Sequence, residues 1–163
     1  MLPSIDELLD LDVLTLREHT ERAGDTFDVD RHRASLQQSL AAGSTLCAVR
    51  RDGTLVAYAM LRPESQTCWF VSAFSTHPLH RTSAVFELLV QIAGLARAKG
   101  IAELRSHVYK TNRLSVSFHR KLGFQVVKEN SKGVEFFAPV SALGNRPAVL
   151  RAAGRHGNRG FSA

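Results

Sequence analysis

The chain has 163 residues, of which 44% are apolar and 22% charged, and its formal net charge is +6. This length and composition are typical of one globular domain. No apolar run approaches the roughly 20 residues that cross a bilayer, and the N-terminus lacks the basic start and apolar stretch of a secretory signal. We therefore expect a cytoplasmic protein with no membrane contact.

The chain has two cysteines, Cys47 and Cys68, and each lies in an apolar segment. Two thiols are too few for a disulfide framework, and their spacing is not that of a metal site. We expect both to be small buried side chains, and we expect no metal.

Most of the positive charge lies at the C-terminal end. Residues 141–163 carry four arginines and no acid, and so supply four of the six net positive charges. Such a tail, with Phe161 for stacking, could contact RNA. A solvated tail, or one that docks on a second subunit of a homodimer, is the favoured interpretation. The sequence thus predicts one domain over residues 1–140 and a basic Gly/Arg-containing tail over 141–163, without a nucleic-acid partner.

The first 24 residues fit two kinds of secondary structure. Their apolar residues have helical spacing, whereas Val13–Arg17 could begin a strand. Beyond them, Asp28 or Asp30 can cap a helix over Arg31–Ala42, which Gly43 would end.

Strands are predicted next. Asp52-Gly53 is a strong turn dipeptide, and it lies between the apolar runs Thr45–Arg50 and Leu55–Met60, which predicts a hairpin. A Pro-containing break then precedes a third strand, Cys68–Phe74.

A helix is predicted after His77-Pro78, because apolar residues recur there at helical spacing up to Gly100. These residues are Val85, Leu88, Leu89, Ile92 and Ala96. The segment Ile101–Tyr109 that follows is typical of a strand.

A short helix over Asn112–Lys121 is predicted to pack through Leu114, Phe118 and Leu122, and Gly123 would end it. A last hairpin follows, with strands Phe124–Lys128 and Val134–Ala138. The order of elements predicts an α/β (α+β) fold, in which a mixed, mostly antiparallel sheet contains one strand-helix-strand crossover and is flanked by helices.

One run of residues has the spacing of a known family. It reads Leu104-x-Ser106-x-Val108-x-x-x-Asn112-x-x-Ser115-x-x-Phe118-His119-x-Lys121-Leu122-Gly123-Phe124. The run resembles the second half of the core of the GNAT superfamily, which are acyl-CoA-dependent N-acyltransferases. The resemblance extends over residues 45–138, and His119 stands where the family most often has Tyr.

The start of the predicted long helix departs from the family pattern. The family has a glycine-rich phosphate loop here, whereas this chain reads Arg81-Thr82-Ser83-Ala84-Val85-Phe86, without glycine. The donors of such a loop are backbone N–H groups at the positive end of a helix dipole, and these survive substitution. Thr82 and Ser83 would add hydroxyls and Arg81 a charge. The alternative is that Thr82 or Ser83 simply caps the helix.

The resemblance implies acetyl-CoA as co-substrate and a primary amine, on a small molecule or a protein, as acceptor. It implies that the backbone of Phe74, Ser75 and Thr76 binds the pantetheine arm, that residues 81–86 bind the diphosphate, and that Asn112 and Ser115 lie beside the arm.

The resemblance also implies catalytic candidates. His119, in the position of the family's Tyr, would protonate the departing sulfur. The amine must also lose a proton, and the candidates to accept it are weaker than the candidate acid. Glu103 and His107 share one face of a strand, and Glu64 lies in the preceding loop. Ser72 could order a water molecule. Two other functions stay open, a GNAT-like domain that no longer binds CoA and serves as a binding or assembly module, and an RNA-associated protein.

Overall fold

The computed structural model of the protein describes residues 1–144. The predicted basic tail therefore lies outside the described residues, apart from its first four positions, which belong to helix α5 (Val140–Gly144). Val140 and Leu143 of this helix pack against the core. None of the helices in residues 1–144 is long and apolar enough to cross a membrane.

A six-stranded sheet with the order β1-β2-β3-β4-β6-β5 forms the centre of the fold. Its strands are β1 (Thr45–Arg51), β2 (Thr54–Pro63), β3 (Cys68–Thr76), β4 (Glu103–Tyr109), β5 (Gln125–Glu129) and β6 (Gly133–Pro139). Neighbouring strands are antiparallel except β3 and β4, which are parallel and are joined through a helix. The predicted mixed, mostly antiparallel sheet is confirmed.

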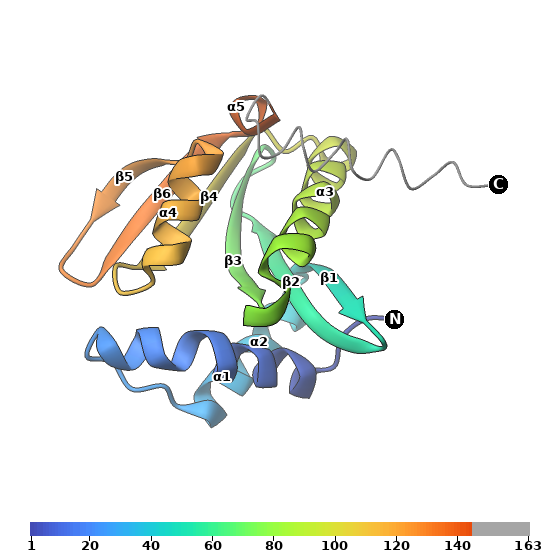
Figure 1. The fold of residues 1–163 in the computed structure, drawn as a ribbon. Coiled ribbons are helices and arrows are strands. Elements are labelled where there is room, and N and C mark those ends of the chain that lie inside the picture. The colour runs from blue at the N-terminus through green and yellow to red at the C-terminus, as the bar shows by residue number, and fades with distance from the viewer. Residues whose placement is uncertain (145–163) are drawn as a thin grey trace.

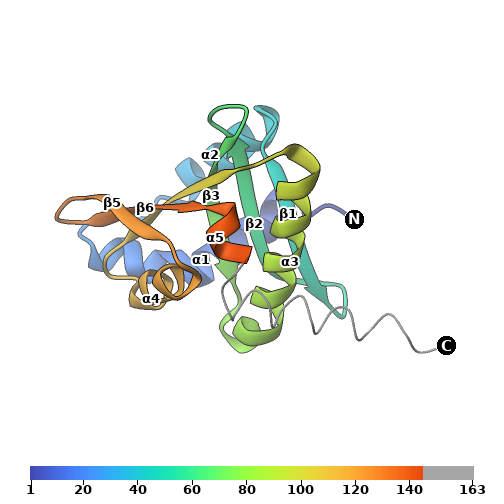
Figure 2. The ribbon, with the colours of Figure 1, turned by 90° about the horizontal axis from the view of Figure 1, so that it is seen from above.

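Helices cover both faces of this sheet. They are α1 (Ile5–Arg22), α2 (Val29–Ala41), α3 (Arg81–Lys99) and α4 (Arg113–Leu122), with the short 3-10 helix η1 (Pro78–His80) before α3. Figure 1 shows α3 and α4 on the near side of the sheet and α1 and α2 below it, and Figure 2 shows the same arrangement from above. One apolar core lies between α3, α4 and the sheet, and a second between α1, α2 and β2.

Local sequence explains how the helices begin. Of the two structures predicted for residues 1–24, the helix is confirmed, and Ser4 and Glu7 form a capping box at its start. Helix α2 begins at Val29, two residues before the predicted start, because the Asp28 carboxylate accepts the Arg31 backbone N–H. The β1–β2 turn has positive φ angles at Asp52 and Gly53, as the Asp-Gly dipeptide predicts.

Two packing predictions are wrong. Leu114 is 60% exposed, whereas Phe118 and Leu122 pack toward the core as predicted, together with the buried His119. Cys47 is buried as predicted, but Cys68 is only half-buried, since it starts β3 at the edge of the core.

Candidate functional site

The parallel strands β3 and β4 part halfway along their length. Their pairing extends only from Cys68–Glu103 to Val71–Ser106, and Figure 1 shows them separating from there toward α1. The cause lies on the other edge of β3, where Val71 pairs with Leu61 and Ala73 with Met60, so that Ser72 is an extra residue. Such a β-bulge bends its strand and increases the twist. Within the described part of the chain, one edge of β3 therefore has no partner strand beyond Val71.

An apolar cavity of about 410 Å³ lies on the α3/α4 side of this split. Its walls are mainly aliphatic and aromatic side chains from α3, α4, α5 and the paired part of β3 and β4. Leu89 and Ile92 form the α3 wall, and Phe118 and Leu122 form the α4 wall. This surface suits an uncharged, flexible ligand segment.

A polar cavity of about 290 Å³ lies on the α1/α2 side. Its titratable groups are Asp12 and His19 from α1, His32 from α2, Tyr58 from β2, His107 and Tyr109 from β4, and His119 from α4. Four of the seven histidines of the chain are among them. Val71, Phe74 and His119 line both cavities, so the two meet at the split.

The buried carboxylate of Asp12 organises the inner wall of the polar cavity. The hydroxyl of Tyr58 donates to Oδ2 at 2.6 Å and that of Ser75 to Oδ1 at 2.8 Å, while Nε2 of His32 lies 2.7 Å from Oδ2. The contacts join α1, α2, β2 and β3. Burial, together with the neighbouring charge of Asp12, raises the pKa of Tyr58 well above its usual value, so its phenol keeps the proton that it donates.

His119 is 7% exposed, and its ring stacks on that of Phe136 with the centroids 4.8 Å apart. Nδ1 lies 2.7 Å from the carbonyl oxygen of Ser115, which only accepts, so Nδ1 carries the proton. Nε2 then accepts from the hydroxyl of Ser106 at 3.1 Å. Burial lowers the pKa of His119 from 6.5, and the hydrogen bond to Ser115 opposes this only in part. The ring is therefore neutral at neutral pH.

The start of α3 offers backbone donors next to the split. The N-cap residue is His80, and no side chain of residues 1–144 makes a capping hydrogen bond there, so neither Thr82 nor Ser83 is the cap. Ser83 instead accepts a bond from Arg51. Arg81, Thr82 and Ser83 are exposed, Ala84 is buried, and Val85 and Phe86 are half-buried. A helix start of this kind is a ready anion site.

Two further predicted ligand contacts lie near the split. The hydroxyl Oγ1 of Thr76, at the end of β3, is buried and has no hydrogen-bond partner among residues 1–144. The side-chain oxygen of Asn112 accepts from the backbone N–H of Ser115 and so caps α4, while Asn112 also lines the polar cavity. Asn112 thus has a structural role whether or not it contacts a ligand.

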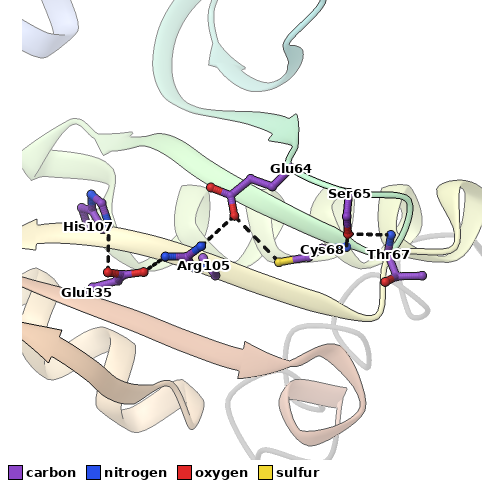
Figure 3. Close-up of polar contacts among 7 residues, drawn as sticks. All are labelled: Glu64, Ser65, Thr67, Cys68, Arg105, His107 and Glu135. Atoms are coloured by element: carbon purple, nitrogen blue, oxygen red, sulfur yellow. Dashed lines mark hydrogen bonds and ion pairs between the residues drawn. The ribbon is translucent and has the colours of Figure 1, made fainter.

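Two of the predicted proton acceptors, Glu64 and His107, contact other polar side chains of the sheet. Figure 3 shows a chain along the sheet in which Arg105 pairs with Glu64 at 3.0 Å and with Glu135, and Glu135 in turn faces His107 at 3.6 Å. Burial, together with the charge of Arg105, lowers the pKa of His107. Glu64 is not among the residues that line the polar cavity, whereas His107 lines it.

The other two catalytic candidates of the sheet lie apart. Ser72 lines the polar cavity at the bulge, with its hydroxyl donating to the carbonyl of Met60 at 3.1 Å. Glu103 pairs with Cys68 and Pro139 at the far end of β4, away from the split. The structure therefore brings Ser72 and His119 together in one cavity and leaves Glu103 outside it.

Sequence reasoning missed Asp12, His32 and Tyr58. One signal existed: His32, Ser35 and Ser39 have the spacing of one helix face, and all three line the cavity. Polar residues on the side of a helix that faces a sheet are unusual enough to indicate a site. The partner of His32, however, lies 20 residues away on another helix, and no local pattern joins them.

A family model described as the acetyltransferase (GNAT) family matches residues 8–124. No curated protein matches the sequence. Among solved structures, PaiA N-acetyltransferase from Thermoplasma acidophilum in complex with coenzyme A has a TM-score of 0.69 at 16% identity, covering 83% of this chain and 92% of that one.

Two other solved structures have similar scores. Aminoglycoside 6'-acetyltransferase type Ii has a TM-score of 0.66 at 15% identity, over 83% of this chain and 89% of that one. Ribosomal-protein-S18-alanine N-acetyltransferase from Escherichia coli has 0.66 at 10% identity, over 85% and 90%. At such low identity these likenesses establish the shared fold.

Proposed function

Because the chain belongs to the acetyltransferase (GNAT) family, we propose that it transfers an acetyl group from acetyl-CoA to a primary amine. The observation that carries this proposal is the split between β3 and β4, where an apolar and a polar cavity meet from opposite faces of the sheet. A thioester held in the split would be reached from one side by its own CoA arm and from the other by the acceptor.

The residues present fit acetyl-CoA. The backbone donors of the first turn of α3 would bind the diphosphate, supported by the positive charge of Arg81 and the hydroxyls of Thr82 and Ser83. The unpaired edge of β3 over Phe74–Thr76 would bond the pantetheine arm, and the orphaned hydroxyl of Thr76 supports a ligand there. Asn112 and Ser115, at the start of α4, would border the arm.

Amide formation also requires a polarised carbonyl and an accepted proton. Backbone N–H groups of β3 beyond the bulge would polarise the thioester carbonyl. Ser72 and His119 belong to the proposed site, whereas Glu103 does not. A neutral His119 whose two nitrogens are both bonded suits a positioning role, holding Ser106 at the end of the paired strands, better than that of an acid.

The class of acceptor follows from the polar cavity and not from the fold. Two structures with this fold are named for different acceptors, an aminoglycoside and the alanine of a ribosomal protein. In this chain a cavity of about 290 Å³ with a buried carboxylate supports a compact cationic amine, or the single amine-bearing end of a larger molecule.

One substitution tests the CoA side. Thr82→Glu places a negative charge in the first turn of α3, where it stabilises the helix by about 0.3–1 kcal/mol but repels a diphosphate. We expect the dissociation constant of acetyl-CoA, measured by calorimetry, to rise about tenfold or more, with an unchanged or higher melting temperature. Thr82→Gln has the shape of the Glu variant without its charge and loses only the hydroxyl, so it should raise the dissociation constant much less than Thr82→Glu does.

Two results would count against the proposal. A wild-type protein whose melting temperature does not rise with millimolar acetyl-CoA has no CoA site, and the alternative of a GNAT-like binding or assembly module would replace the transferase. Equal affinities for Thr82→Glu and Thr82→Gln would remove the diphosphate from the start of α3 while leaving the activity itself in place.

A further inference from the structure

We propose that His32, held by the buried carboxylate of Asp12, accepts the proton that the acceptor amine must lose. This inference rests on the proposed acetyl transfer and adds the group that this reaction needs on the acceptor side. A primary ammonium with a pKa near 10.4 carries its proton at neutral pH, so it cannot attack a thioester until a base removes that proton.

The contact between Asp12 and His32 fixes the tautomer of the imidazole. Asp12 is 1% exposed in its side chain, and its carboxylate only accepts hydrogen bonds, so Nε2 of His32 donates across the 2.7 Å contact. In the neutral ring the lone pair is then on Nδ1. When Nδ1 takes up a proton, the carboxylate faces the new positive charge and stabilises it, as in other Asp-His pairs that serve as bases.

His32 is placed where a ligand can reach it. Its side chain is 28% exposed, although its partner Asp12 is fully buried. It lines the polar cavity with Ser35 and Ser39 from the same face of α2, and its ring packs on Phe27 with the centroids 5.0 Å apart. Asp12 also holds Ser75 of β3, so the dyad is connected to the strand that borders the split.

The other titratable groups of the cavity are less suited to accept a proton. The hydroxyls of Tyr58 and Tyr109 donate to Asp12 and Asp25. Both nitrogens of His119 are bonded, and His107 faces Glu135. These groups come from β2 and β4 and from α4.

Helix α1 contributes the remaining charged groups. Nδ1 of His19 is buried and lacks a partner among residues 1–144. The guanidinium of Arg17 lies over the ring of Phe27, 5.6 Å from its centroid, and Arg17 does not line the polar cavity. Among residues 1–144, only His32 combines a buried carboxylate partner with a ring that is open to the cavity.

The proton and bond changes balance as follows. The ammonium gives one proton to Nδ1 of His32, which passes it to solvent. The amine nitrogen then bonds to the thioester carbonyl carbon, the carbon–sulfur bond breaks, and the second proton of the nitrogen neutralises the leaving thiolate. The products are the amide, CoA and one released proton.

The test compares full-length wild type with His32→Gln between pH 6 and 10, using 1,4-diaminobutane as the probe amine and thiol release as the assay. We expect His32→Gln to lower kcat/KM about 100-fold at pH 7, within the range of general-base catalysis, and by less than tenfold near pH 10, where a substantial share of the probe amine has already lost its proton. Arg31→Gln, an exposed change on the same helix, should keep the wild-type pH profile.

We expect all three proteins to bind acetyl-CoA with equal affinity. A wild type that does not bind acetyl-CoA would contradict the proposed function, whereas a wild type that binds it leaves the role of His32 to be tested separately. A loss in His32→Gln that is the same at every pH would overturn the inference, because a purely structural residue gives that result. Nitrogen-15 NMR of the imidazoles provides a readout without any acceptor. It should show the neutral ring of His32 protonated at Nε2, and a proton on Nδ1 instead would also overturn the inference.

Discussion

On the α3/α4 side of the split the cavity wall consists mostly of apolar side chains, whereas on the α1/α2 side buried polar groups bond to one another around Asp12. Apolar packing has no preferred direction, and its strength follows the area removed from water. Buried hydrogen bonds depend on position, and a missing partner costs more than a made bond contributes. One side is thus suited to hold a flexible arm, and the other to orient a nucleophile and move its proton.

Phe136→Ala tests the apolar side and should have the largest effect. Phe136 is fully buried under the ring of His119, so its truncation should lower the free energy of unfolding by about 3–5 kcal/mol, as measured by urea denaturation. Val126→Ala, at an exposed position of β5, should change the same quantity by less than about 0.5 kcal/mol. A loss below about 1 kcal/mol for Phe136→Ala would show that packing does not dominate this side.

Tyr58→Phe tests the polar side with an intermediate effect. The change keeps the buried ring but removes one donor from Asp12, which should lower the free energy of unfolding by about 1–3 kcal/mol. The matched change Tyr109→Phe removes a donor from the more exposed Asp25 and should cost less. If the two variants lose equal stability, burial of the carboxylate does not determine how much its hydrogen bond contributes to the free energy of unfolding.

The smallest effect is expected from pH. Burial lowers the pKa of His119, so the unfolded chain takes up a proton at a higher pH than the folded one. Stability from a neutral His119 is therefore complete above pH 6.5 and declines as the pH falls toward the folded value. We expect the melting temperature to fall between pH 7.5 and 5, with a shallower fall in His119→Gln; parallel curves would contradict the assignment of the decline to this ring.

Local patterns in the sequence predicted most of the fold. The Asp52-Gly53 turn, the helix that ends at Gly100 and the order of strands and helices are as predicted, because each depends on neighbours within a few residues. On α4, Phe118 and Leu122 pack toward the core as predicted, but Leu114 is exposed and His119 is buried, because hydrophobicity alone does not assign these two residues to a face.

The candidate site depended on contacts that no local pattern contains. Ser72 becomes a bulge only through the register between β2 and β3, and that bulge opens the split. Along the sequence Glu103 was a candidate proton acceptor and Ser72 a residue that could order a water molecule, yet the pairing of β4 places Glu103 at the far end from the cavity.

The sequence by itself determined the elements, their order and the resemblance in the second half of the core, because periodicity, caps and turns act over short distances. Only the tertiary structure decided which polar groups meet. Asp12 is 46 residues from Tyr58 and 63 from Ser75, and their bonds form only when α1 packs on the sheet and removes the carboxylate from water. A carboxylate buried in this way needs hydrogen-bond donors from other parts of the fold, and the side chains that supply them form the polar wall of the site.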